Sequence, residues 1–164
     1  TIALLKSLSL GRESRIVLTN REAHGGVAEL QEALGWPVLV QEQEAYLLPS
    51  IKRLESFSQQ HVTLSGLRLL WTPGPTPGSC IVYAPLPWNV LFCGRLLTPV
   101  ANDRIASIRT KSTFHWSFQQ MSLRKLHQCF HSDHSPGLAS SEGIHNLGDE
   151  KILPWDSWNN NFYE

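Results

Sequence analysis

Side chains that could bind a metal or transfer a proton are concentrated in two short segments. Residues 129–134 read Cys-Phe-His-Ser-Asp-His, and His131 and His134 could bind zinc with the nearby Asp and Cys if the segment folds into one turn. Residues 20–26 read Asn-Arg-Glu-Ala-His-Gly-Gly and place His24 beside two glycines. A single histidine is not a metal site. For residues 131–134 we favour a polar loop with two solvated imidazoles over a zinc site.

Nucleophilic catalysis has less support in the sequence. Ser79 and Cys93 do not lie in a Gly-x-Ser-x-Gly elbow, which exposes a nucleophile at a strand-to-helix turn. Gly25-Gly26 at a helix start could hold an anion through backbone N–H groups, but the segment lacks the lysine and the spacing of a P-loop. We therefore assign no catalytic residue.

A turn rich in proline and glycine occupies residues 71–79, which read Trp-Thr-Pro-Gly-Pro-Thr-Pro-Gly-Ser. This turn resembles the metal-binding turn of the metallo-β-lactamase superfamily, His-Thr-Pro-Gly-His-Thr-Pro-Gly-Ser, in which the second His binds the metal; Pro75 stands at that position. Residues 20–26 follow an apolar run and resemble the family's loop Thr-His-Arg-Asp-His-x-Gly-Gly. On that alignment Asn20, Glu22 and Ala23 stand at ligand positions and His24 at a spacer.

Two later segments extend the resemblance. Residues 90–95, Val-Leu-Phe-Cys-Gly-Arg, resemble the strand that ends in Phe-x-Gly-Asp, whose Asp bridges two metals; this chain carries Arg95 there. Residues 135–138, Ser-Pro-Gly-Leu, resemble the Leu-Pro-Gly-His turn that supplies a last His, with Leu138 in its place. The resemblance covers residues 14–140 and implies an α/β fold, an αββα sandwich with mixed sheets.

The residues now at the ligand positions argue against a catalytic metal. A hydrolytic zinc site needs about three or four His, Cys or carboxylate ligands and one open position for water. Alanine, proline and leucine have no donor atom, and asparagine is a poor ligand for transition metals. Of the matched residues only Glu22 keeps a good donor, so we expect no metal and no cofactor.

Arg95 offers two further hypotheses. Its guanidinium would repel a divalent ion and could pair with Glu22 inside the cleft, the alternative being that Arg95 points into solvent. With Arg21 or His24 it could instead bind a small anion, because the guanidinium fork matches phosphate and carboxylate groups.

Composition limits the partners and the compartment. The chain has 14 basic and 14 acidic residues, so no net positive field attracts nucleic acid or an anionic membrane surface. Three cysteines without Cys-x-x-Cys spacing indicate reduced thiols. No apolar stretch approaches the length of a membrane span. We therefore expect a cytoplasmic protein without nucleic-acid or membrane partners.

The elements expected to position these residues follow from local patterns. Apolar residues within 1–10 predict a helix packed on the domain, and Gly26 to Gly35 reads as a helix between strands at 15–19 and 37–40. We expect a short helix at 42–48, a polar surface segment at 50–60 and hairpins at 61–71 and 80–93. Residues 116–130 predict a helix with these apolar points: Phe118, Met121, Leu123, Leu126 and Phe130.

The chain is expected to form a single domain over 1–164, with a mostly irregular tail at 141–164 whose aromatic residues pack on the core or form a docking surface. Only 19 residues precede Asn20, so the resemblance implies N-terminal strands that are reduced or missing, either because the sequence is a fragment of a longer chain or because the domain is reduced. An exposed sheet edge would favour self-association or a protein partner.

The sequence favours a non-catalytic binding or scaffold module. The alternative is a metal-dependent hydrolase with a site rebuilt from Glu22, His24, Arg95 and the 131–134 loop.

Overall fold

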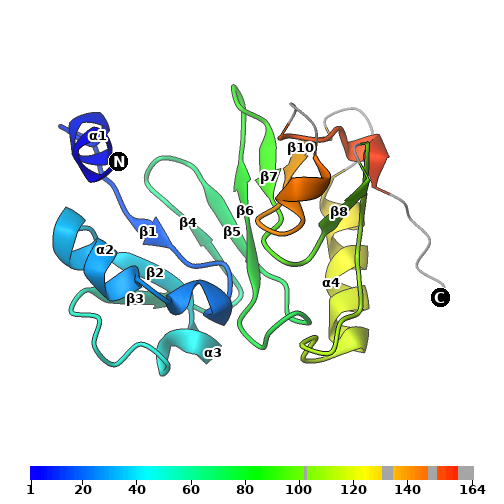
Figure 1. The fold of residues 1–164 in the computed structure, drawn as a ribbon, viewed down its shortest axis with the longest axis horizontal. Helices are drawn as coiled ribbons and strands as arrows, with labels where there is room; N and C mark the ends of the chain where they lie inside the picture. The colour runs from blue at the N-terminus through cyan, green and yellow to red at the C-terminus, as the bar shows by residue number, and fades with distance from the viewer. Residues whose placement is uncertain (102, 131–134, 148–150, 159–164) are drawn as a thin grey trace.

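The N-terminal sheet is built from three parallel strands. In the computed structural model, which describes residues 1–101, 103–130, 135–147 and 151–158, the strands β1 (Ile16–Val17), β2 (Val38–Gln41) and β3 (Leu54–Phe57) pair in that order. Every residue of β2 is buried, as expected for a parallel strand covered on both faces. This N-terminal sheet has β2 at its centre and β1 and β3 on either side (Figure 1).

Helix α2 (Val27–Leu34) connects β1 to β2 and completes the predicted β-α-β unit. Both of its caps, Gly26 and Gly35, adopt the left-handed conformation that favours glycine, with φ of 72° and 73°. The 3₁₀ helix η1 (Arg21–His24) precedes α2, and the short helix α3 (Glu42–Ala45) follows β2 where a helix is predicted.

A second, mixed sheet follows along the chain. Its strands are β4 (Gln60–Val62), β5 (Arg68–Trp71), β6 (Cys80–Ala84), β7 (Val90–Phe92) and β10 (Gly137–Ala139). The strand order is β10-β7-β6-β5-β4, and all pairs are antiparallel except β10 with β7. Both predicted hairpins are confirmed. A separate two-stranded ribbon joins β8 (Thr98–Ala101) to β9 (Arg104–Ala106).

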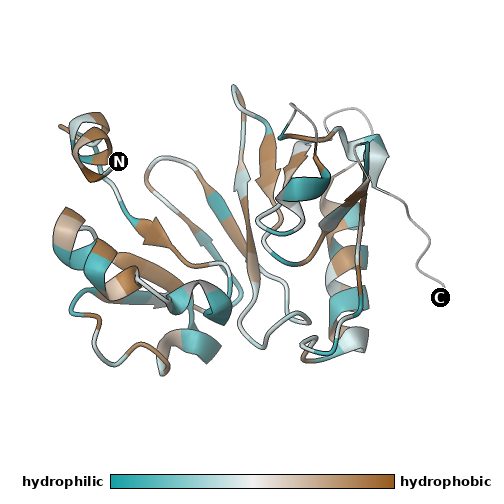
Figure 2. Cartoon of the chain, in the orientation of Figure 1, coloured by the Kyte–Doolittle hydropathy of each residue, from teal (hydrophilic) through white to brown (hydrophobic). Residues whose placement is uncertain are grey.

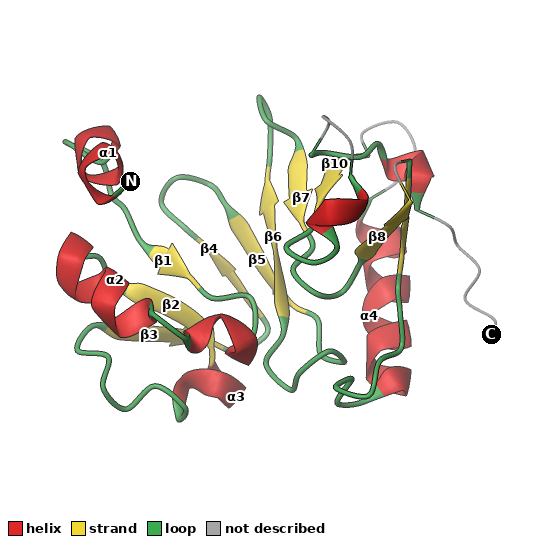
Figure 3. Ribbon diagram, viewed as in Figure 1, coloured by secondary structure: helices red, strands yellow, loops and turns green. Residues whose placement is uncertain are grey.

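The two sheets face each other between outer helices, with α2 and α3 on one side and α4 (Trp116–Cys129) on the other (Figure 3). Apolar residues are concentrated in the strands, whereas α4 carries both polar and apolar residues (Figure 2). One core cluster includes Val27 of α2 and Val38 of β2, and a second joins Leu39 of β2 to Leu69 of β5 between the sheets. This is the predicted αββα layer order.

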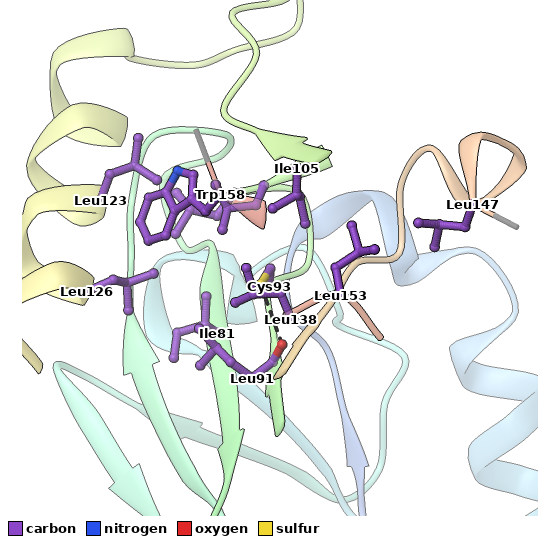
Figure 4. Close-up of a cluster of buried hydrophobic side chains, with 12 residues drawn as sticks. Ile81, Leu91, Cys93, Ile105, Leu123, Leu126, Leu138, Leu147, Leu153 and Trp158 are labelled. Carbon is purple, nitrogen blue, oxygen red and sulfur yellow. Dashed lines mark hydrogen bonds between the residues drawn. The ribbon is translucent and has the colours of Figure 1, made fainter. Parts of the chain in front are cut away.

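The largest cluster lies between the second sheet and α4 (Figure 4). It contains Leu91 from β7, Leu126 from α4 and Leu138 from β10, and Trp158 closes it from the C-terminal segment. The described parts of the predicted irregular segment, residues 141–147 and 151–158, contain the 3₁₀ helices η3 (Ile144–Asn146) and η4 (Trp155–Ser157) and no α-helix. Because Trp158 is 4% exposed, this segment belongs to the core.

Three local predictions were wrong in part. Residues 50–60, predicted as a polar surface segment, contain β3; its middle residues are exposed because β3 lies at the sheet edge. Helix α1 (Ile2–Leu8) forms, but none of its residues is buried. On α4, Phe118 and Met121 are exposed. Its buried face contains the predicted Leu123 and Leu126, together with Gln119 and Ser122, which were not predicted.

Candidate functional site

The turn at residues 71–79 is held by its own hydrogen bonds. Thr72 N–H donates to the Ser79 carbonyl at 2.8 Å, and Thr76 N–H donates to Ser79 Oγ at 2.9 Å. Gly74 has a φ of 142°, and a Cβ there would lie 2.4 Å from Gln119 Cα, so only glycine fits between the turn and α4. The turn predicted from sequence therefore keeps a defined shape through protein contacts.

Asn20 at the start of the upstream loop has a structural role. Its side chain is 5% exposed, and its Oδ1 accepts the Glu22 N–H at 3.0 Å, which caps η1. Ala23 lies within η1. The family resemblance expects a metal ligand at position 20, but the side-chain oxygen of Asn20 there accepts a helix-capping hydrogen bond.

Glu44 of α3 is a fully buried carboxylate at this site, with 0% exposure. Its Oε1 accepts hydrogen bonds from Thr76 Oγ1 and, at 3.1 Å, from Gly78 N–H. Arg21 Nε lies 3.4 Å from the same oxygen. One buried carboxylate thus joins α3, η1 and the 71–79 turn. Sequence reasoning missed it because a glutamate in a short helix is usually exposed.

His24 lies in the same region. Its Nε2 and the Oε2 of Glu44 are buried and have no hydrogen-bond partner among the residues that the structure describes. Burial lowers the pKa of His24 below its ordinary value of 6.5, the nearby Glu44 opposes this shift and Arg21 adds to it. The neutral imidazole is thus favoured. The predicted partners of His24 in a rebuilt metal site, His131 and His134, lie outside the described residues.

Arg95, which follows β7, forms the predicted ion pair. Its Nη1 donates to Glu22 Oε1, and its Nε lies 3.8 Å from Glu142 Oε1. Its Nη2 also donates to Ser112 Oγ at 2.9 Å. The Arg95 side chain is 13% exposed, whereas both carboxylates are about half exposed. The pairing of Arg95 with Glu22 is confirmed, and Glu142 is an additional partner that the sequence did not predict.

A cavity of about 100 Å³ lies beside Arg95. Pro75 from the turn and Glu142 from the C-terminal segment reach it, so the structure brings the predicted positions Pro75 and Arg95 together. The loop before α4 closes against the turn, since Phe114 N–H donates to the Pro75 carbonyl at 3.1 Å. The remaining lining residues are Thr98, Ile108, Thr110, Thr113 and Gln119.

Leu138 does not belong to this cleft, so its assignment as a site position was wrong. It is 1% exposed and lies in the core cluster with Leu91 (Figure 4), because β10 pairs with β7 and inserts this side chain into the sheet's covered face. Glu142, after the end of β10, reaches the cavity instead. The short apolar strand followed by Ser-Ser-Glu-Gly was the available signal for it.

The site contains few groups with catalytic potential. Within the parts of the chain that the structure describes, no group of three or more His, Cys, Asp or Glu residues could hold a metal ion. Burial raises the pKa of both Cys80 and Cys93 to about 12, which makes them poor nucleophiles.

No helix in the described ranges has the length and apolarity needed to cross a membrane.

No protein-family model matches the sequence, and no curated protein matches it. Solved structures of the metallo-β-lactamase superfamily share the fold. The B3 metallo-β-lactamase BLEG-1 superimposes with a TM-score of 0.63 at 18% identity, over 94% of this chain and 79% of that one. An N-acyl homoserine lactone hydrolase, solved with its product at a catalytic metal centre, gives a TM-score of 0.61 at 18% identity over 88% and 62%.

The superfamily protein ST1585 from Sulfolobus tokodaii has a TM-score of 0.61 and 16% identity, over 86% of this chain and 63% of that one. At such low identities these likenesses establish the fold. They do not transfer the hydrolytic chemistry of the lactamase or the lactone hydrolase to this chain.

Proposed function

We propose that this chain is a non-catalytic protein of metallo-β-lactamase fold that acts as a binding or scaffold module without a catalytic metal. The observation that carries the proposal is the position of Arg95, which lies beside Pro75 and pairs with Glu22 and Glu142. By the family resemblance, Arg95 and Pro75 stand where a bridging Asp and a His ligand are expected. A fixed cation therefore takes the place of the metal.

Electrostatics supports this assignment. The carboxylates that could attract a divalent ion, Glu22 and Glu142, are already paired with Arg95. At an effective dielectric constant of about 20, a unit positive charge repels a divalent ion ~4 Å away by roughly 8 kcal/mol. A metal entering the cleft would have to displace the guanidinium or overcome this repulsion.

The contacts of Glu44 support it as well. Metal binding commonly contributes free energy to folding, and a fold that lost its ion needs other contacts at the same place. Glu44 accepts hydrogen bonds from Thr76 and Gly78 and lies within ion-pair distance of Arg21. These bonds connect the turn to η1 without an ion.

Metal content tests the proposal. The protein is purified without a histidine tag, incubated with zinc, iron and manganese, freed of unbound ion and measured by plasma mass spectrometry. We expect far less than one metal per chain. One or two metals per chain would overturn the proposal and support the alternative, a metal-dependent hydrolase with a rebuilt site.

A pair of variants tests the physical reason. Pro75→His alone should bind no zinc, because Arg95 remains in the cleft. Pro75→His combined with Arg95→Asp places a histidine and an aspartate beside Glu22 and Glu142 and should retain zinc after dialysis. Arg12→Asp, combined with Pro75→His, is the control, because Arg12 is exposed and takes no part in the ion pairs of Arg95. Zinc retention by Pro75→His alone would contradict the role given to Arg95.

A further inference from the structure

A second cavity, of about 290 Å³, lies between α4, the end of β5 and the start of the 71–79 turn. Its walls are mainly apolar, with Trp71 and Pro73 contributed by β5 and the turn and Phe118 and Met121 contributed by α4. Phe118 and Met121 are the apolar residues of α4 that were predicted to be buried and are exposed. Instead of packing in the core, they line a groove that is open to solvent.

Hydrogen bonds within the protein fix two walls of this groove. The indole Nε1 of Trp71 donates to the Pro77 carbonyl at 2.8 Å. Ser122 Oγ of α4 donates to the Pro73 carbonyl, also at 2.8 Å, and so ties the turn to the helix. Walls that are already ordered lower the entropic cost of binding. The groove is therefore formed before a ligand enters it.

The charge of the groove comes from Lys125 of α4, and no acidic residue lines it. Lys125 forms no ion pair with any residue that the structure describes. Gln59 adds a side-chain amide that can donate hydrogen bonds. A carboxylate accepts charge-assisted hydrogen bonds from an ammonium group, so the charge of the groove favours an anionic group next to an apolar body.

The size and composition of the groove suit a small molecule. Its volume of about 290 Å³ equals about ten water volumes at ~30 Å³ each, which is room for about ten non-hydrogen atoms. Binding sites for small molecules are typically lined by apolar and aromatic side chains, with a few polar groups that set the orientation. Here Lys125 and Gln59 are such polar groups.

We propose that this groove binds a small amphipathic monocarboxylate, whose apolar chain contacts Trp71 and Phe118 and whose carboxylate pairs with Lys125. The proposal goes beyond the proposed function, because no described residue lines both this groove and the cavity beside Arg95. Binding in the groove and metal in the cleft of Arg95 can therefore be measured independently.

Met121 provides a direct probe, because it is the only methionine in the sequence and lines the groove. In protein labelled for NMR at the methionine methyl group, octanoate should shift the Met121 signal in a saturable way. Loss of the signal in Met121→Leu identifies it. Octylammonium has the same chain with the opposite charge, and acetate has the carboxylate without the chain. Neither should reproduce the shift.

Lys125→Met should weaken octanoate binding about tenfold, since a hydrogen bond to a charged group is lost. Arg124→Met is the matched control, because it removes the same charge from the same helix at an exposed position outside the groove. It should change binding by less than about twofold, since solvent and salt screen an exposed charge.

Phe118→Ala should also weaken octanoate binding, because it removes part of the apolar wall. Phe114→Ala is its control, since Phe114 is an exposed phenylalanine that does not line the groove. Absence of an octanoate response, an equal response to octylammonium, or full octanoate binding by Lys125→Met would overturn the ligand assignment. Metal content measured on the same sample decides the proposed function separately.

Discussion

Replacing Glu44 by methionine tests whether this buried carboxylate holds the site together. Glu44→Met keeps the length of the side chain but removes the acceptor of the Thr76 hydroxyl and the Gly78 N–H. An unpaired buried donor costs about 1–3 kcal/mol, and Thr76 keeps a second partner in Ser79. The lost pair with the part-exposed Arg21 adds about 0–1 kcal/mol. We expect a total destabilisation of about 1–4 kcal/mol.

Urea unfolding followed by fluorescence measures this change. With a slope of about 2 kcal/mol per molar urea, the midpoint should fall by about 0.5–2 M. Glu44→Gln keeps one acceptor and should lie between wild type and Glu44→Met. Glu42→Met is the matched control on the same helix, because Glu42 is exposed and its loss should change stability by less than about 0.5 kcal/mol.

The reasoning fails if Glu44→Met unfolds at the same urea concentration as Glu42→Met, or at a higher one. Such a result would mean that the desolvation of the buried carboxylate outweighs its hydrogen bonds. The shape of the 71–79 turn would then rest on its internal bonds, such as the one from Thr76 N–H to Ser79 Oγ.

Four further outcomes follow from the structure. Leu138→Ala should destabilise the protein by about 2–5 kcal/mol in urea unfolding, because the side chain lies in the main core. Gly74→Ala should cost about 2–5 kcal/mol through backbone strain and overlap with α4, whereas Gly25→Ala, which meets no atom within 4 Å, should cost far less. A thiol reagent should label one thiol per native chain, the exposed Cys129. Burial raises the pKa of Cys93 from 9.0 to about 12, so the neutral Cys93 thiol should contribute fully to the free energy of unfolding below pH 9 and less as the pH rises toward 12. Cys93→Ala should reduce this loss of stability at high pH.

The parts of the fold predicted from sequence are those with strong local signals. Gly26 and Gly35 mark both ends of α2, and Ser65-Gly66 marks the turn between β4 and β5. Strand β3 was missed because an edge strand exposes polar residues such as Glu55 and so lacks an apolar run. The buried face of α4 was predicted at Leu123 and Leu126, whereas Gln119 was missed because a tertiary hydrogen bond to Ser107 holds it there.

The candidate site could be predicted where this chain carries a residue of opposite charge to the one that the family resemblance expects. Arg95 at the position of an expected acid led to the pairing with Glu22, which the structure contains. Glu142 was missed because the Pro-Gly pair at 136–137 aligned the motif with Leu138, and Pro-Gly occurs in many turns. Glu44 had no local signal, because its burial depends on a turn far along the chain.

The position of β10 has a consequence for how the chain folds. Strands β4 to β7 join sequence neighbours through short connections, so their pairing closes quickly and can begin while the chain is still being synthesised. Strand β10 and Trp158 arrive last, and until then β7 presents an unpaired edge and the apolar side of the sheet stays uncovered. Unpaired edges and exposed apolar surface promote aggregation. Nascent chains that end before residue 137 should therefore be the species most in need of a chaperone.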